Sequence, residues 1–285
     1  MIEECVAAPV TQSDFERLRD FLYRTTGIVF EDGKYDFIRR RVQQRIEKTR
    51  ARDFRAYFTL LQSITPDAEL QNFVNLITIN ETYFFREEYQ LRSLVRGVLD
   101  EIVEREPTKS TIRIWSIPCA TGEEPYSLAI YLLEHWPRAD AYGIEIVGSD
   151  IDTAVLDRAR RGRFSARSVR NLPRSLLDKY FTAEGPDEYL ICDALRESIE
   201  FTHVNLNAGS LRSHSGFDVV MCRNLLIYFD ELSRRRAVET LYESLSPGGF
   251  ICLGHSESMS RISNLFRPRK FPDAMLYQKP LEGGL

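Results

Sequence analysis

The sequence has no run of apolar residues long enough to cross a membrane, which takes roughly 18 to 20 such residues. It also lacks a surplus of positive charge, because 38 lysines and arginines stand against 42 aspartates and glutamates, a formal net charge of −4. A chain with this balance has no global positive field to draw it to nucleic acid. The first ten residues contain neither the basic region nor the long apolar core of a signal peptide. We therefore expect a cytoplasmic protein that binds no nucleic acid and is not embedded in a membrane.

Cysteine and histidine are also scarce. The five cysteines are odd in number and widely scattered, no two form a CxxC pair, and the four histidines are not spaced like metal ligands. Three of the cysteines lie in or beside apolar runs, as buried free thiols of a reducing compartment do. The sequence therefore favours free thiols over disulfides and predicts no metal site.

What the sequence does contain changes character at about residue 110. Before that point apolar residues recur at helical spacing, which predicts helices and no strand. Ser13 and Glu16 stand at capping-box spacing, Gly27 is well placed to end the first helix, and Pro66 suits a first helical turn. We expect a helical domain over residues 1–85 and a linker helix over 86–110. The five predicted helices cover residues 13–27, 35–50, 53–63, 65–80 and 87–106.

After Pro107 short apolar runs alternate with amphipathic helices, the pattern of a mainly parallel sheet covered by helices on both faces. Residues 162–198 interrupt the alternation, and EYLICDALRESIEF has the pattern of two short strands around a turn, so we expect a small inserted β-subdomain. The predicted fold class is α/β, a Rossmann-like domain over residues 111–285 preceded by the all-α domain. The predicted strands are IRIWSIP, YGIEIVGSD, IEFTHVNL, FDVVMCRN and GGFICLG, with DAMLYQK as an added antiparallel strand.

The first loop of this predicted sheet contains little glycine. A loop that binds a dinucleotide needs several glycines, because its backbone must approach a pyrophosphate. Here PCATGEEP has one glycine, Gly122, and two carboxylates, Glu123 and Glu124. Negative charge at a helix N-terminus suits the helix dipole but repels phosphate. These acids favour S-adenosylmethionine, which has a sulfonium and an ammonium group and no phosphate, although each acid alone is also explained by helix stability.

Another acid follows the second strand. Asp150 ends the run IVGSD, at the place where an α/β fold usually hydrogen-bonds ribose hydroxyls. Asp152, two residues later, has the position of a cap for the next helix. Acids at two consecutive strand ends together predict a cofactor site.

Six blocks of the sequence resemble, in order and spacing, the CheR-type chemoreceptor glutamate methyltransferases: NETYFFRE, PCATGEEPYSLAI, GSDID, VNL, CRNLLIYF and LSPGGFICLGHSE. The likeness covers nearly the whole chain, and a glycine-poor first loop is normal in that family. It implies transfer of a methyl group from S-adenosyl-L-methionine to glutamate side chains of methyl-accepting chemotaxis receptors, which forms glutamyl methyl esters for sensory adaptation. The other product is S-adenosyl-L-homocysteine. We expect the enzyme to be a monomer.

The resemblance also implies roles for single residues. It makes Arg223 a cofactor-binding residue, although Arg223 has a second interpretation, as a structural ion-pair partner. Tyr228 lies one helical turn beyond Asn224, on the same face if a helix begins there. The implied cofactor-binding residues are Asn80, Thr82, Arg86, Glu123, Glu124, Asp150, Asn205, Leu206, Arg223 and Asn224.

The implied reaction needs no general base, because a carboxylate is already ionised at neutral pH. The enzyme must instead align the carboxylate and exclude water from two opposite charges. We expect Arg86 and Tyr228 to orient the substrate carboxylate through charge-assisted and hydroxyl hydrogen bonds.

Residues 34–55 are strongly basic, with nine lysines and arginines against three acids. A solvated helix face is one interpretation, and RNA binding is another, although the segment lacks interleaved stacking side chains. The resemblance implies a third, in which a basic helix steers toward acidic receptor helices. In some members of the family the β-subdomain also docks a peptide from the receptor C-terminus. The receptor-contacting residues would be Arg39, Arg40, Arg41 and Arg45.

Two other functions fit part of the sequence. A catalytically idle signalling module would bind cofactor or partner without turnover, but the orienting pair Arg86 and Tyr228 is present. A methyltransferase of similar fold that acts on RNA or on a small molecule is the other alternative, since fold alone does not determine substrate. Such an enzyme would have little use for a basic helical domain or for the NETYFFRE linker.

Overall fold

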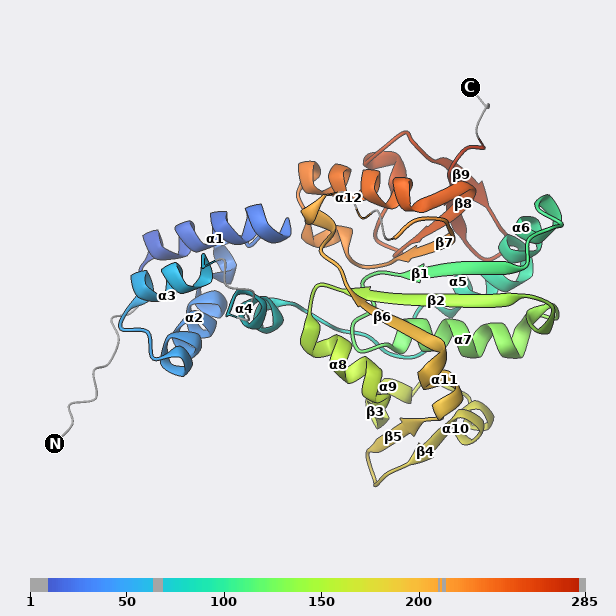
Figure 1. Ribbon diagram of the computed structural model, residues 1–285, viewed down its shortest axis with the longest axis horizontal. Coiled ribbons are helices and arrows are strands. Elements are labelled where there is room, and N and C mark those ends of the chain that lie inside the picture. Colours follow the sequence, from blue (N-terminus) through green and yellow to red (C-terminus); the bar gives the residue numbers. More distant parts are fainter. Residues whose placement is uncertain (1–9, 64–68, 210, 212–213, 282–285) are drawn as a thin grey trace. The chain divides into compact units, whose positions relative to one another are not determined.

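The computed structural model describes residues 10–63, 69–209, 211 and 214–281 (Figure 1). The chain forms two compact units, Met1–Ile79 and Asn80–Leu285. The division falls just before the segment NETYFFRE, residues 80–87, which is called the linker below, whereas the expected boundary follows residue 85. No helix in these described ranges has the length and apolar character that a membrane crossing requires. Cys119, Cys192, Cys222 and Cys252 are free thiols, and Cys5 lies outside the described residues.

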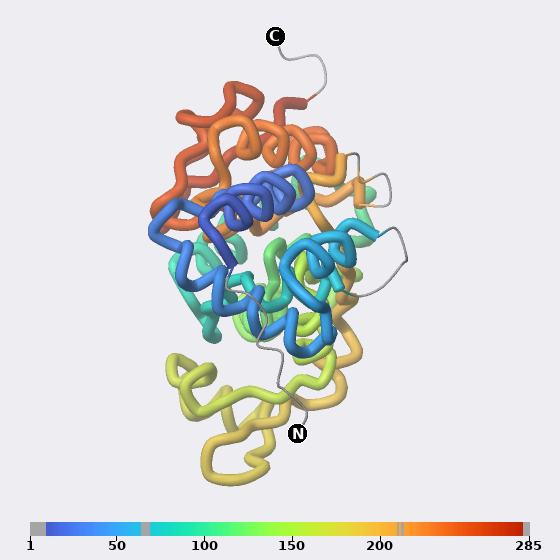
Figure 2. Tube along the Cα trace, turned by 90° about the vertical axis from the view of Figure 1, so that its left-hand side faces the viewer, coloured from blue at the N-terminus to red at the C-terminus, as the bar shows by residue number. Residues whose placement is uncertain are grey.

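The first unit is helical, as predicted, and Figure 2 shows its helices in blue to cyan. The start proposed at Pro66 lies outside the described residues. Apolar side chains from all four helices form one core, which includes Phe15, Val42, Tyr57 and Phe73. The helices are α1 (Gln12–Thr26), α2 (Tyr35–Thr49), α3 (Phe54–Leu61) and α4 (Glu69–Ile77), with a 3-10 turn η1 (Asp32–Lys34) before α2.

The cap of α1 lies two residues before the predicted one. Thr11 is the N-cap: its side chain accepts the Asp14 N–H at 3.2 Å, and the Asp14 carboxylate accepts the Thr11 N–H at 3.0 Å. The capping box at Ser13 and Glu16 was therefore wrong, because the same spacing two residues earlier has the correct backbone geometry. Gly27 ends the helix in the left-handed conformation with φ 74°, as expected.

The second unit is built on a seven-stranded sheet in the order β6-β2-β1-β7-β8-β10-β9. Strands β6, β2, β1, β7 and β8 run parallel, and β10 and β9 are antiparallel, which confirms the predicted strands. Strand β9 was not predicted, because RPRK has no apolar residue to indicate a strand and a proline in a strand is tolerated mainly at a sheet edge. The strands are β1 (Thr111–Ser116), β2 (Gly143–Asp150), β6 (Ile199–His203), β7 (Phe217–Cys222), β8 (Leu245–Leu253), β9 (Arg267–Lys270) and β10 (Met275–Gln278).

Helices cover this sheet. The predicted helix over 87–106 is present, with a π-helical segment η2 (Leu94–Val98) between its two α-helical parts, and both η2 and its first part contact the helix that follows β1. The helix after β2 packs against β2 and β6, and the last helix packs against β8. These helices are α5 (Glu88–Ser93), α6 (Leu99–Arg105), α7 (Glu123–His135), α8 (Thr153–Arg161) and α12 (Glu231–Ser244).

The inserted subdomain has a three-stranded antiparallel sheet in the order β3-β5-β4, which lies beyond the β6 edge of the main sheet (Figure 1). EYLICDALRESIEF differs from the prediction, because a helix rather than a turn joins its two strands and the second strand, β6, belongs to the main sheet. The subdomain consists of β3 (Arg163–Ser165), α9 (Ala166–Val169), α10 (Arg174–Tyr180), β4 (Phe181–Ala183), β5 (Glu188–Ile191) and α11 (Asp193–Ser198).

Candidate cofactor and substrate site

The sheet topology brings the predicted cofactor residues to one edge. The parallel strands β6, β2, β1 and β7 are neighbours, so their carboxyl ends lie side by side. The loop with Gly122 follows β1, Asp150 ends β2, Asn205 follows β6 and Arg223 follows β7. Ligands of open α/β sheets bind outside this edge.

The single glycine of the first loop serves helix packing. Gly122 caps α7 with φ 96°, a conformation that other residues rarely adopt. A Cβ atom there would lie 3.0 Å from the Ala159 Cβ of α8 and 3.1 Å from the Tyr126 ring. The close contact and the positive φ explain why position 122 is a glycine.

Asp150 ties this loop to β2. Its carboxylate accepts the backbone N–H groups of Ala120 and Asp152, each at 2.9 Å. The side chain is buried, and burial raises the pKa of Asp150 to about 6 despite these hydrogen bonds. The carboxyl group therefore titrates close to neutral pH.

Two further acids lie at the start of α7. Glu123 accepts hydrogen bonds from the hydroxyls of Thr121, at 2.6 Å, and Ser168. Glu124 accepts from the Ser116 hydroxyl and from the Arg223 guanidinium, each at 2.8 Å. Burial raises the pKa of both carboxyls.

Glu123 and Asp150 differ from Glu124 in one respect. Within the described part of the chain neither forms a salt bridge, whereas Glu124 is paired with Arg223. The charge of Arg158 acts on Glu123 only from beyond salt-bridge distance. Two buried carboxylates that form no salt bridge are costly unless hydrogen bonds or a bound cation compensate them. These two carboxylates thus fit a ligand with a positive charge, such as a sulfonium or an ammonium group.

Arg223 makes the structural ion pair of its second interpretation. It is buried and pairs with Glu124 at 2.8 Å and with Glu87 at 3.4 Å. It also donates to the backbone carbonyl of Arg86 at 2.5 Å. The backbone on either side of Arg86 is strained, with φ 57° at Phe85 and 54° at Glu87. Arg223 thus holds the linker in the conformation that places Arg86, and its contact with a cofactor stays a prediction.

The NETYFFRE linker, residues 80–87, lies near the carboxyl end of β2. Asn80 donates to the Asp152 carboxylate at 2.8 Å, and Asp152 caps α8 by accepting the N–H groups of Ala154 and Val155, as expected. Arg86 donates to the Glu81 carbonyl at 2.7 Å. Thr82 is half-buried and its hydroxyl makes no hydrogen bond to another described residue.

Asn224 does not begin a helix. Its backbone is left-handed with φ 58°, its N–H is held by the Glu257 carboxylate at 3.0 Å, and a 3-10 turn η5 (Leu226–Tyr228) follows. The helical-turn relation between Asn224 and Tyr228 was therefore wrong. Tyr228 is half-buried, and burial raises its pKa while the charge of Arg86 opposes that rise. The expected orienting pair thus lies within electrostatic reach of each other.

The end of β6 supplies an uncharged part of the edge. Asn205 accepts the Asn207 N–H at 2.9 Å and so caps the 3-10 turn η4 (Leu206–Ala208), in which Leu206 is buried. Neither residue carries a charge, so this part of the edge suits a neutral ring better than a charged group.

Only some of the arginines of the basic helix α2 are exposed. Arg40 is exposed, Arg39 is partly exposed and lies 3.5 Å from Asp36, and Arg41 lies over the Phe37 ring at 5.3 Å. Arg45 is instead buried, a correction to its assignment as a receptor contact, and it donates to Glu69 at 2.8 Å. It follows Ile38 by seven residues, so it shares the apolar stripe of the helix.

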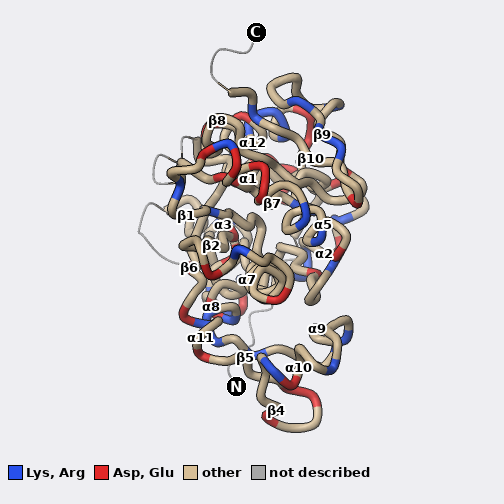
Figure 3. Tube along the Cα trace, turned by 90° about the vertical axis from the view of Figure 1, so that its right-hand side faces the viewer, with Lys and Arg blue, Asp and Glu red and all other residues tan. Residues whose placement is uncertain are grey.

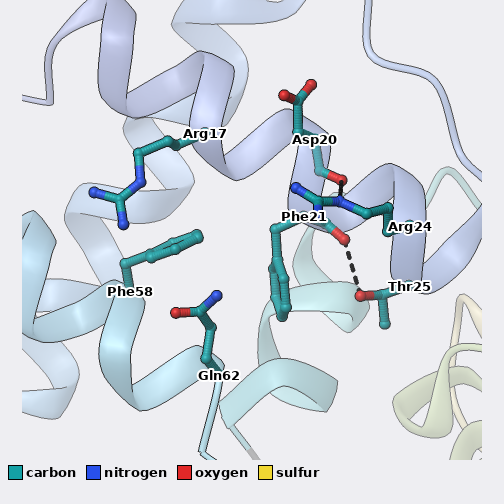
Figure 4. Close-up of a pocket in the computed structure, with 7 residues that line it drawn as sticks. All are labelled: Arg17, Asp20, Phe21, Arg24, Thr25, Phe58 and Gln62. Carbon is teal, nitrogen blue, oxygen red and sulfur yellow. Dashed lines mark hydrogen bonds between the residues drawn. The ribbon is translucent and has the colours of Figure 1, made fainter.

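A pocket of about 380 Å³ opens between α1 and α3 (Figure 4). Phe58 forms part of its wall, and the guanidinium of Arg17 lies 4.8 Å from the centre of that ring. No predicted site residue contributes to the pocket, and no sequence motif indicated it. Its lining residues are Arg17, Asp20, Phe21, Arg24, Thr25, Phe58 and Gln62.

Comparison with known proteins identifies relatives over both units. Residues 80–275 match the model of the CheR methyltransferase SAM-binding domain, and residues 13–78 match that of the CheR methyltransferase all-alpha domain. The chain is 52% identical to chemotaxis protein methyltransferase 2 of Vibrio cholerae, over 96% of this chain and 95% of that protein. It is 35% identical to chemotaxis protein methyltransferase 2 of Pseudomonas aeruginosa, over 90% of each chain. It is 33% identical to the chemotaxis protein methyltransferase of Escherichia coli, over 91% of this chain and 89% of that one.

Proposed function

The chain belongs to the CheR family of methyltransferases, and from this premise we propose that it methylates glutamate side chains of methyl-accepting chemotaxis receptors. It is an S-adenosyl-L-methionine-dependent enzyme. The observation that carries the proposal is that Arg86 and Tyr228 belong to the same unit as Glu123 and Asp150, two buried carboxylates that form no salt bridge within the described residues. The pair suits an anionic substrate, whereas the carboxylates suit a cationic cofactor.

S-Adenosyl-L-methionine, when bound, supplies an electrophilic methyl group on a sulfonium. The receptor glutamate attacks with one of its own oxygens and has no proton to lose, so the protein orients and desolvates the carboxylate without a base. Arg86 donates charge-assisted hydrogen bonds to the carboxylate. The Tyr228 hydroxyl donates to it as well and stays protonated, because burial raises its pKa.

Other residues at the strand edge hold the cofactor. We assign the cationic part to Glu123 rather than Glu124, since Arg223 neutralises Glu124. Asp150 accepts hydrogen bonds from the ribose hydroxyls, and Asn205 and Leu206 frame the adenine. Asn80, Thr82 and Asn224 complete the set that the family resemblance implies.

The receptor is recognised outside the reacting centre. The exposed face of α2 with Arg39, Arg40 and Arg41 attracts the acidic receptor helix, mainly through the association rate. A receptor C-terminal peptide at the β-subdomain would tether the enzyme near its target. The enzyme acts as a monomer on the cytoplasmic part of the receptor.

Label transfer tests the proposal. Purified protein, methyl-labelled S-adenosyl-L-methionine and a receptor cytoplasmic fragment should yield labelled receptor, and mild base should release the label as volatile methanol. A fragment with its methylation-site glutamates changed to alanine serves as the control and should remain unlabelled. Label in RNA or in a small metabolite would contradict the substrate, and cofactor binding without transfer to any cognate receptor would indicate an idle module.

Cofactor binding should weaken in acid. With a pKa of about 6, roughly one tenth of Asp150 is ionised at pH 5, so calorimetry should show a Kd about tenfold higher at pH 5 than at pH 7.5. The free energy of unfolding should instead be higher in acid. The pKa of Asp150 is raised from 3.8 in the unfolded chain to about 6 in the folded one, so this carboxyl does not destabilise the protein below pH 3.8, and its destabilising effect grows as the pH rises to about 6.

The Asp150→Asn variant isolates this carboxyl from Glu123 and Glu124, whose pKa values burial also raises. It should bind cofactor more weakly at pH 7.5 and lose most of the pH dependence. A wild-type Kd that stays constant from pH 5 to 7.5 would contradict the assignment of Asp150.

A further inference from the structure

The short helix α9 carries two exposed arginines, Arg167 inside it and Arg170 directly after it. Both contact the linker that leads to Arg86. The Arg170 guanidinium lies 4.7 Å from the centre of the Tyr83 ring, and the Arg167 guanidinium lies 3.5 Å from the Glu81 carboxylate. Figure 3 shows basic segments in blue at α9. Two charges of the inserted subdomain are therefore placed beside the proposed substrate site.

Buried contacts fix the place of α9. The Phe84 N–H donates to the Ser168 carbonyl at 2.9 Å, which joins linker and helix by their backbones. The buried Phe84 ring packs edge-on against Phe164 at 4.8 Å and Phe181 at 5.2 Å, measured between ring centres. The position of the two arginines is thus set by packing and not by their exposed side chains alone.

The Arg86 guanidinium lies over the same Tyr83 ring, at 5.8 Å from its centre. Three guanidinium groups therefore lie against neighbouring linker residues: those of Arg86 and Arg170 lie over the Tyr83 ring, and that of Arg167 lies beside Glu81. Among the described residues the Glu81 carboxylate is the only one within salt-bridge distance of any of the three. Glu87 also interacts with the charge of Arg86, but its carboxylate is paired with Arg223 at 3.4 Å, so positive charge predominates around Tyr83. The charge of Arg86 lowers the pKa of Tyr228, whereas those of Glu81 and Glu257 raise it, so this group of charges borders the orienting pair.

Arg170 differs from the other arginines of its subdomain. Arg163 pairs with Glu184 and Glu188, and Arg174 pairs with Asp178 at 2.9 Å. Arg170 has no carboxylate within salt-bridge distance in the part of the chain that the structure describes, and its guanidinium lies over the Tyr83 ring. A ring holds a guanidinium in place but leaves its N–H donors available for an anion.

We propose that Arg167 and Arg170 form a second receptor-contact surface, which binds carboxylates of the receptor helix close to the glutamate being methylated. This inference rests on the proposed function. On a helix, acids three, four or seven residues from the target lie on the same face, about one or two turns of 5.4 Å away. The excess of positive charge beside Arg86 is complementary to such a row of acids, so the surface selects glutamates that have acidic neighbours.

The full chain with Arg167→Glu and Arg170→Glu tests the inference. At low salt its KM for a receptor fragment should rise about tenfold, since two exposed charge pairs become repulsive, and the rise should shrink to about twofold in 0.5 M salt. The kcat should stay within about twofold of wild type, and the Kd for cofactor should not change. Arg174→Glu on α10 is the matched control, because its side chain is 79% exposed against 77% for Arg167, and its KM should stay near wild type.

A receptor fragment with lysines in place of the acids beside its target should restore the low KM of the double variant. The milder pair Arg167→Gln and Arg170→Gln guards against misfolding and should raise KM about threefold. An equal KM rise in Arg174→Glu would show a general charge effect and overturn the inference. A fall in kcat at unchanged KM would do the same, since it would make Arg170 a positioning residue for Arg86. If the wild-type enzyme methylates the fragment but its KM equals that of the double variant, this surface alone is refuted. If the wild-type enzyme does not methylate the fragment at all, the proposed function is refuted.

Discussion

Replacement of Arg86 by alanine is expected to lower kcat for receptor methylation by about a hundredfold to a thousandfold. That range is typical when one preorganised donor at a reacting oxygen is removed. Arg223 and the strained backbone at Phe85 and Glu87 hold Arg86 in place, so a water molecule would not reproduce its alignment. The measurement is label transfer at saturating cofactor and receptor, with cofactor affinity determined separately by calorimetry.

The controls for this variant separate orientation from acid–base chemistry. Arg86→Lys keeps the charge but loses the planar fork, so it should recover only part of the rate. Tyr228→Phe removes one neutral donor and should lower kcat about tenfold. Because no base is required, wild-type kcat should be flat between pH 7 and 9. If the Arg86→Ala enzyme reaches wild-type kcat at saturating cofactor, Arg86 binds the cofactor and does not orient the substrate carboxylate.

Replacement of Arg45 by alanine should destabilise the helical unit by about 3–5 kcal/mol, the cost of leaving one member of a buried ion pair alone. Arg45 and Glu69 have side chains only 7% and 9% exposed, and the Tyr57 hydroxyl donates to the same carboxylate at 2.8 Å. After the substitution Glu69 would remain buried without its cation. Urea unfolding of the full chain followed by circular dichroism measures the loss.

Arg40→Ala, on the exposed face of the same helix, should change the unfolding free energy by less than about 0.5 kcal/mol. The triple variant Arg45→Met, Glu69→Leu and Tyr57→Phe should regain most of the lost stability, because apolar side chains of similar volume need no partner. If the Arg45→Ala protein unfolds like wild type but has a raised KM for receptor, Arg45 contacts the receptor and does not stabilise the core.

The fold was largely predictable because hydrophobic period is a local signal. The helices before residue 110 follow from apolar spacings of three to four residues, and the five parallel strands follow from short apolar runs, as strands buried on both faces do. The predictions failed where the local signal was weak or ambiguous. RPRK has no apolar residue to indicate strand β9, and DALRES is short enough that α11 resembled a turn.

The candidate site was predictable to the extent that topology determines it. Carboxyl ends of neighbouring parallel strands must meet, so residues at the ends of β6, β2, β1 and β7 come together whatever their side chains. The roles of charged residues were harder to predict. Arg39 and Arg45 look alike in the sequence, yet one is partly exposed and the other lies in the core.

By itself the sequence determined the order and type of most elements, the edge of the sheet at which the predicted cofactor residues meet and, through its motifs, the family. Only the tertiary structure decided which charges are buried, paired or left over. Arg45 and Glu69 are 24 residues apart, Arg223 and Glu124 are 99 apart, and Arg170 reaches Tyr83 from another subdomain. The free energy of a charge depends on its burial and on its partners in space. Neither quantity is encoded in the local spacing of residues along the chain.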